Sequence, residues 1–178
     1  YYQFPVGNNV TTTIGARVRQ DDMLGVWPSA YPSDAILDML ASAGANHAYN
    51  LAVGAGAGVT WEKDNWVASG LFISQDADEA DSNERTAGGL LTDQGRDDVT
   101  GQVAYVTDTF TIAAAVTKSD NGNWNETPDA LDRQAYGLSG YYLTDYDSQW
   151  LPSTFSAGVG WSNPDNEVVT DTRADESE

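Results

Sequence analysis

Eight stretches of this chain alternate side-chain types with a period of two, and the connections between them alternate strictly between short and long. A period of two is that of a β-strand. The expected strands are residues 1–6, 10–19, 48–61, 66–75, 98–107, 109–118, 134–144 and 153–162. The short connections are 7–9, 62–65, 108 and 145–152, and the long ones are 20–47, 76–97, 119–133 and an acidic loop or tail, 163–178. An antiparallel up-and-down meander then has all its tight turns at one end, as transmembrane β-barrels do.

The carboxylates lie almost entirely in these connections. Of the 27 Asp and Glu residues, 22 fall in the long connections and the tail, counting Asp98 at a strand edge with them, and five fall in the short turns. A soluble sheet with one wet face carries charges on that face, whereas a bilayer penalises charge over about 25 Å of each strand. The chain contains no run of about 18 apolar residues, so the sequence does not predict a membrane helix. We therefore expect residues 1–178 to be all-β, with about eight strands of an antiparallel up-and-down transmembrane β-barrel.

Three of the expected strands have one apolar face and one face of small or polar residues. The apolar faces carry Leu51, Val53, Ala55, Ala57, Val59 and Trp61; Phe110, Ile112, Ala114 and Val116; and Phe155, Ala157, Val159 and Trp161. The strand 66–75 does not separate in this way, so its orientation stays open. Trp61, Trp66, Tyr105 and Phe110 flank the tight turns, where an aromatic girdle at a membrane interface would lie. Such aromatics also cap the core of soluble sandwiches.

Two strings in the first 75 residues resemble a known family. "YYQFPVGNNV…IGARVRQDDMLGVWPSAYPSDAILD" and "YNLAVGAGAGVTW" are similar to the outer-membrane porins of cyanobacteria, in the carbohydrate-selective (OprB-type) porin family whose members carry an S-layer-homology domain. The resemblance implies a homotrimer of barrels with many more strands than eight. It implies passage of inorganic ions and small solutes, with iron uptake proposed for some members. The absent S-layer-homology domain and the end on Glu178, in place of a terminal aromatic, suggest part of a barrel.

The long connection 20–47 is expected to fold inward as a constriction. In the strand 10–19, strict alternation puts Arg17 and Arg19 on one face with Thr11 and Thr13. Because charge facing lipid at mid-bilayer depth costs about 2–4 kcal/mol, these arginines should face the lumen. A helix of about 34–42, capped by Ser33 or Asp34 and ended by Gly44, follows in the loop. The expected pore residues are Arg17, Arg19, Asp21, Asp22, Asp34 and Asp38. In the alternative, 20–47 is an ordinary external loop whose helix packs on a neighbouring subunit, and the arginines only pair with Asp21 and Asp22.

Catalysis and nucleic-acid binding find little support in the sequence. The net charge of −19 opposes a phosphate backbone as partner and favours cations. The single histidine, His47, has no nucleophile-elbow or phosphate-loop pattern beside it, and the chain has no cysteine. The glycines of 54–58 lie within an alternating strand, where they allow close packing on the barrel interior. We expect a passive channel, not an enzyme, with a lipid bilayer, identical subunits, small solutes and cations as partners.

Two acidic runs offer oxygen ligands of the kind that calcium prefers. Their candidate ligands are Asp76, Asp78, Asp81, Asp120, Asn123 and Glu126. Neither run has the twelve-residue pattern with its glycine and final glutamate, and a solvated external loop is the better explanation of both. A second function remains open at this point: a secreted, calcium-dependent β-sandwich that binds carbohydrate through exposed tryptophans.

Overall fold

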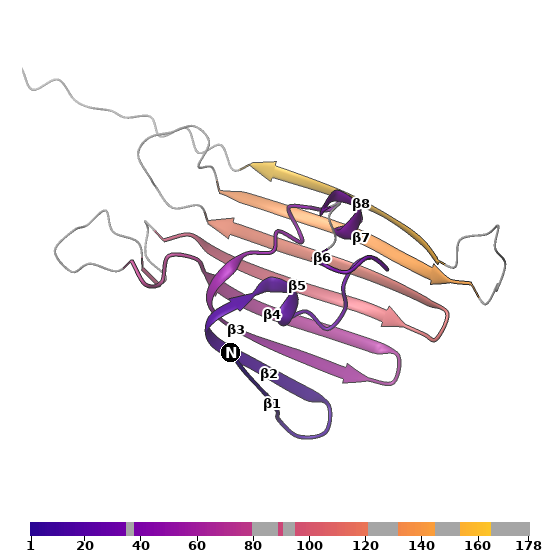
Figure 1. Ribbon diagram of the computed structural model, residues 1–178, viewed down its shortest axis with the longest axis horizontal. Helices are drawn as coiled ribbons and strands as arrows, with labels where there is room; N and C mark the ends of the chain where they lie inside the picture. The colour runs from indigo at the N-terminus through magenta and orange to yellow at the C-terminus, as the bar shows by residue number, and fades with distance from the viewer. Residues whose placement is uncertain (35–37, 80–88, 91–94, 121–131, 145–153, 165–178) are drawn as a thin grey trace, which may run out of the picture.

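The computed structural model describes residues 1–34, 38–79, 89–90, 95–120, 132–144 and 154–164. Eight strands dominate the described residues (Figure 1). They are β1 Tyr2–Pro5, β2 Val10–Arg19, β3 Val53–Lys63, β4 Trp66–Ser74, β5 Asp97–Val106, β6 Phe110–Asp120, β7 Arg133–Leu143 and β8 Thr154–Pro164. A 3-10 turn, η1 Gln20–Asp22, and one helical turn, α1 Asp38–Ala41, lie between β2 and β3. None of the described helical segments is long and apolar enough to cross a membrane.

The strands form one antiparallel sheet in chain order, from β1 to β8. Each of the first seven strands pairs with the strand that follows it, so the predicted up-and-down meander is confirmed. In the described residues β1 and β8 each pair on one side only, and the sheet is open. β2 to β8 are 9 to 11 residues long, which is the length that a tilted strand needs to span a bilayer.

Alternation along the strands gives the sheet two chemically different faces. One face, which we call the open face, carries apolar side chains in register across six strands: Trp61, Ala68, Val103, Ala114, Leu138 and Val159. The adjacent register on the other face, which we call the covered face, carries Thr60, Ser69, Gln102, Ala115, Gly137 and Gly160. The predicted apolar faces of 109–118 and 153–162 are the open face, as is that of β3 from Val53 onward.

Aromatic rings line the tight-turn end of the open face. Trp66 packs edge-to-face on Tyr105 with ring centroids 5.1 Å apart, and Tyr105 lies 6.0 Å from Phe110. Phe110 in turn pairs with Tyr142 across β6 and β7, and Tyr142 pairs with Phe155. The rings that the sequence places at separate turns therefore form a continuous row across the strands, at the tight-turn end of the sheet.

The described residues between β2 and β3 lie across the covered face (Figure 1). We call residues 20–34 and 38–52 the covering segment. Its only α-helical turn among the described residues, α1, falls inside the predicted helix 34–42, and the chain then turns through positive φ at Ala43 and at Gly44, with φ of 52° and 77°. Residues 48–52, expected in a strand, belong to the covering segment instead, because Leu51 has a positive φ of 54° and Ala48 and Tyr49 are buried against the sheet.

Glycines on the covered face let the covering segment approach the sheet backbone. A Cβ added at Gly58 would lie 2.8 Å from Met23 Cβ, and one added at Gly160 would lie 2.5 Å from Ala45 Cα. Close packing, which was the interpretation of the glycine-rich stretch, is thus confirmed at Gly58. Beside it, Met23 and Val18 pack with Leu71 and Ile73 in a small apolar core. That core settles the orientation of β4, whose Leu71 and Ile73 lie on the covered face.

Four carboxylates lie inside strands, which corrects the expectation of strands free of them. They are Glu62 in β3, Asp97 and Asp98 in β5, and Asp120 in β6. All of them lie within the first two or last two residues of their strands, away from the middle of the sheet. The middle of each of these three strands carries no carboxylate, in agreement with the charge penalty that a bilayer imposes. The strand pairing continues beyond this carboxylate-free middle.

Candidate functional site

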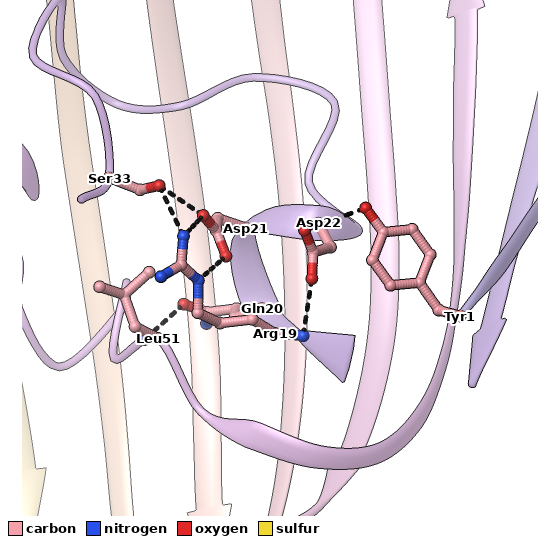
Figure 2. Close-up of polar contacts among 7 residues, drawn as sticks. All are labelled: Tyr1, Arg19, Gln20, Asp21, Asp22, Ser33 and Leu51. Atoms are coloured by element: carbon pink, nitrogen blue, oxygen red, sulfur yellow. Dashed lines mark hydrogen bonds and ion pairs between the residues drawn. The ribbon is translucent and has the colours of Figure 1, made fainter. Parts of the chain in front are cut away.

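The first part of the site is the point where the chain leaves β2 and enters the covering segment. Arg19 donates from Nε and Nη2 to the two carboxylate oxygens of Asp21, both at 2.5 Å, and from Nη2 to Ser33 Oγ at 3.1 Å (Figure 2). Ser33 also donates to Asp21. Asp22 accepts the Arg19 backbone N–H at 3.0 Å and the hydroxyl of Tyr1. These bonds tie two distant points of the covering segment to the end of β2.

The electrostatics of this junction favour the charged pair. Burial raises the pKa of Asp21, but the hydrogen bonds from Arg19 and Ser33 outweigh it, so the pKa lies below its ordinary value. Arg19 thus pairs with a neighbouring carboxylate, which is the simpler of the two arrangements that the sequence allowed. Asp34 is exposed beside this junction, and the side chain of Asp38 lies outside the described residues.

A β-bulge changes the faces of the two predicted pore arginines. Gly15 pairs with Gly56, but Val18 pairs with Gly54, so β2 contains one extra residue between them. Strict alternation put Arg17 and Arg19 on the face of Thr13, and this prediction is wrong beyond the bulge. Val18, 2% exposed, holds the covered-face position, while Arg17 is exposed. A bulge reverses the parity of all residues after it.

The second part of the site is a chain of buried polar contacts between the covering segment and the sheet. Gln20 is fully buried; its Nε2 donates to Ala48 O at 3.0 Å and to Thr100 Oγ1 at 2.9 Å, and its Oε1 accepts the Leu51 N–H. Thr117 donates to the same Ala48 carbonyl at 2.6 Å and bonds to Thr100 at 2.9 Å. The backbone groups of Ala48 and Leu51, which lie outside helices and strands, are satisfied by the side chains of Gln20 and Thr117.

Asp98 anchors the returning end of the covering segment. Its carboxylate is 1% exposed and accepts hydrogen bonds from Asn50 Nδ2 at 2.6 Å, Ser119 Oγ at 2.6 Å and Gln75 Nε2 at 2.8 Å. Asn50 Oδ1 in turn accepts the Ala52 N–H. The three donors converge on one buried carboxylate and join the covering segment, the end of β4 and β6 at one point.

The same polar contacts continue toward the middle of the covered face. Gln102 donates to Val26 O at 2.8 Å and to the Tyr49 hydroxyl at 3.2 Å. Burial raises the pKa of Tyr49, whose ring packs edge-to-face on Trp27 with centroids 5.6 Å apart. Farther along, Ala30 N–H donates to Ser156 Oγ on β8. The covering segment therefore rests on polar side chains from one side of the sheet to the other.

The sequence held a signal for Asp98 that the prediction did not use. Asp98 has the same parity as Thr100, Gln102 and Ala104, which all lie on the covered face. The prediction grouped Asp98 with the residues of the long connection and therefore did not use its parity. Gln20 carried no comparable signal, because its burial depends on contacts with Thr100, which lies 80 residues away along the chain.

The candidate calcium ligands are only partly described. Asp76 is 2% exposed and Asp78 is exposed, Asp120 ends β6, and Asp81, Asn123 and Glu126 lie outside the described residues. Arg96 donates to both oxygens of Asp76, at 2.8 and 2.6 Å. Within the described ranges no group of three His, Asp or Glu side chains could hold a metal ion. Arg96 thus occupies both oxygens of Asp76 where calcium binding was considered.

The Asp76–Arg96 pair predicts a stability change at acid pH. The hydrogen bonds from Arg96, together with its charge, outweigh burial and hold the pKa of Asp76 below its ordinary value. Because the folded-state pKa is depressed, the stabilisation is complete above the unfolded-state pKa of about 4 and is lost as the pH falls through the folded-state value. Asp76→Asn should therefore lower the melting temperature at pH 7, and this difference should shrink as the pH falls below about 4.

Thermal unfolding followed by circular dichroism at a series of pH values measures this difference. Asp78→Asn is the matched control, since it removes an exposed carboxylate two residues away. A difference between wild type and Asp76→Asn that is equal at neutral and acid pH would contradict the ion-pair explanation.

His47 contacts the sheet through Arg133, the first residue of β7. Arg133 Nη1 lies 2.6 Å from His47 Nδ1. Burial and the charge of Arg133 lower the pKa of His47, so the neutral ring accepts this hydrogen bond.

No family model, no curated protein and no solved structure matches this chain.

Proposed function

We propose that this chain is a wall segment of an outer-membrane porin, a passive diffusion channel for inorganic ions and small hydrophilic solutes with a preference for cations. The supporting observation is the contrast between the two faces of one sheet. The open-face side chains Val99, Val103, Ile112, Leu138 and Val159 are each 48–55% exposed, although they are aliphatic. An apolar surface of this extent on a folded sheet indicates an interaction partner. The acyl chains of a bilayer would cover the apolar side chains of all these strands together.

The polar side chains of the covered face support a channel rather than a barrel with a filled interior. Barrels that carry solutes place polar residues inside and fold loops into the lumen. Here the covering segment lies on the polar face and is held by Gln20, Asp98 and Gln102. It would narrow the lumen of a closed barrel from one side. The constriction that the sequence predicted from Arg17 and Arg19 is therefore proposed for the whole covering segment, with the Arg19–Asp21 pair at its base.

The alternative function requires a different architecture. A calcium-dependent carbohydrate-binding sandwich packs two sheets against each other, and the described strands all belong to one sheet. The covered face packs on the covering segment instead. These observations favour the channel proposal.

Cation preference in a planar bilayer tests the proposal. With 22 carboxylates in the long connections and the tail, the full-length protein should show reversal potentials that favour potassium over chloride at low salt. The preference should weaken as salt rises from about 0.01 M to about 1 M, because the screening length falls from about 30 Å to about 3 Å.

Protonation of the carboxylates provides the control. At a pH well below their ordinary values of about 4, the same channels should lose their preference while still conducting. A protein that stays soluble without detergent and never conducts contradicts the proposal, and chloride preference at low salt contradicts its selectivity.

A further inference from the structure

Two glycines on the open face have no packing reason within the described protein. Gly70 and Gly101 are direct cross-strand partners on β4 and β5. A Cβ added at Gly70 would meet nothing within 4 Å, and one added at Gly101 would meet only Val116 Cγ1, at 3.8 Å. Gly58 and Gly160, by contrast, lie against the covering segment. Glycine weakens a strand and often marks the close approach of another molecule.

The two glycines form the floor of a hollow in the open face. The hollow has a volume of about 650 Å³, and its lining is almost wholly apolar. Its apolar walls are Val59, Phe72, Val99 and Val116. The side chains of these residues stand around the place where the two glycines have none, so the surface dips where its neighbours project.

One of the residues that line the hollow is positively charged. This residue is Lys118, which pairs with Val99 across β5 and β6. Its position is near the end of β6 that leads into the long connection, two residues beyond Val116. In a membrane, that end of the strand lies toward the headgroups, and the glycine pair lies deeper. The cation is exposed in a chain whose net charge is −19.

We propose that this hollow binds one anionic phospholipid, with an acyl chain over Gly70 and Gly101 and the phosphate beside the Lys118 ammonium. This inference rests on the proposed membrane location of the open face. The apolar hollow matches a chain of methylenes, and the lysine matches an anionic headgroup at the adjoining depth.

Native mass spectrometry of the full-length protein in a neutral detergent tests the site. The probes are phosphatidylglycerol and, as the zwitterionic reference, phosphatidylcholine. Lys118→Gln should lower phosphatidylglycerol retention about fivefold and leave phosphatidylcholine unchanged. Gly70→Leu should lower the retention of both lipids, because its side chain fills the hollow without meeting protein atoms at Cβ.

Lys63→Gln is the matched control, since Lys63 is an exposed lysine at the opposite, tight-turn end of the same sheet. It should retain phosphatidylglycerol as wild type does. Equal retention by wild type, Lys118→Gln and Gly70→Leu overturns the lipid site. So does a Gly70→Leu variant that changes the number of subunits without changing the number of bound lipids, since the hollow is then a contact between copies.

Conductance of the same preparations separates the two proposals. A wild-type protein that conducts, while its variants retain phosphatidylglycerol equally, overturns the lipid site alone. A full-length protein that neither inserts nor conducts overturns the channel and the lipid site together.

Discussion

Asp98→Ala is expected to release the returning end of the covering segment and to lower the free energy of unfolding by about 3–5 kcal/mol. The substitution leaves the donors of Asn50, Ser119 and Gln75 without their buried acceptor. Hydrogen bonds to a charged group contribute about 1.5–3 kcal/mol each, and buried donors without a partner carry a desolvation cost. For the full-length protein the channel proposal predicts a higher single-channel conductance, because the segment proposed to constrict the lumen is no longer held on the sheet.

Hydrogen–deuterium exchange of residues 45–52 measures the release directly. The Ala52 amide is protected by Asn50 Oδ1, and Asn50 depends on Asp98 for its position. Asp97→Ala is the control, because it removes the neighbouring carboxylate from the opposite face of β5. Wild-type exchange and wild-type conductance in a folded Asp98→Ala channel would rule out this anchoring role.

Gly158→Ala and Gly160→Ala should push the turn at 43–45 away from β8. A Cβ at Gly158 would lie 2.5 Å from Ala43 O, and one at Gly160 would lie 2.5 Å from Ala45 Cα. The neighbouring atoms belong to the backbone, so the covering segment must move as a whole. Overpacking of this kind costs about 1–3 kcal/mol for each methyl group, and the double variant should lose more than either single one.

Chemical denaturation in detergent gives these free energies. The control is Gly101→Ala, a glycine-to-alanine change in the same sheet whose Cβ would meet its nearest neighbour, Val116 Cγ1, at an ordinary 3.8 Å. It should be neutral or slightly stabilising, since alanine restricts the unfolded chain more than glycine does. If Gly101→Ala destabilised as much as Gly160→Ala, a folded backbone conformation that requires glycine, rather than collision with the covering segment, would explain both.

The order of the strands and their faces could be predicted because both depend on local patterns. Val59, Ile112 and Val159 each alternate with small or polar neighbours, and that alternation alone assigns them to one face. The orientation of β4 could not be predicted, because Leu71 and Ile73 are apolar although they lie on the covered face. There they pack on Met23 of the covering segment. A period-two pattern cannot distinguish an apolar residue under a loop from one against lipid.

The site was predictable only where its contacts are local. Arg19 and Asp21 are two residues apart, and their pairing follows from the sequence. The reversal at Val18 depends on a bulge of one residue, which no local pattern marks. The buried position of Gln20 arises from its contact with Thr100, 80 residues away along the chain. The parity of Asp98 indicates its face, but its bond to Asn50, 48 residues away, has no local signal.

The long reach of the covering segment also sets an order for folding. Each strand pairs with its immediate successor, so the meander needs only the closure of one connection at a time. Ala30, in contrast, bonds to Ser156, which lies 126 residues later, and Ala45 packs against Gly160. We therefore expect the covering segment to reach its final place only after β7 and β8 have joined the sheet. Substitutions in its contacts should therefore act mainly on the rate of unfolding and leave the rate of sheet assembly nearly unchanged.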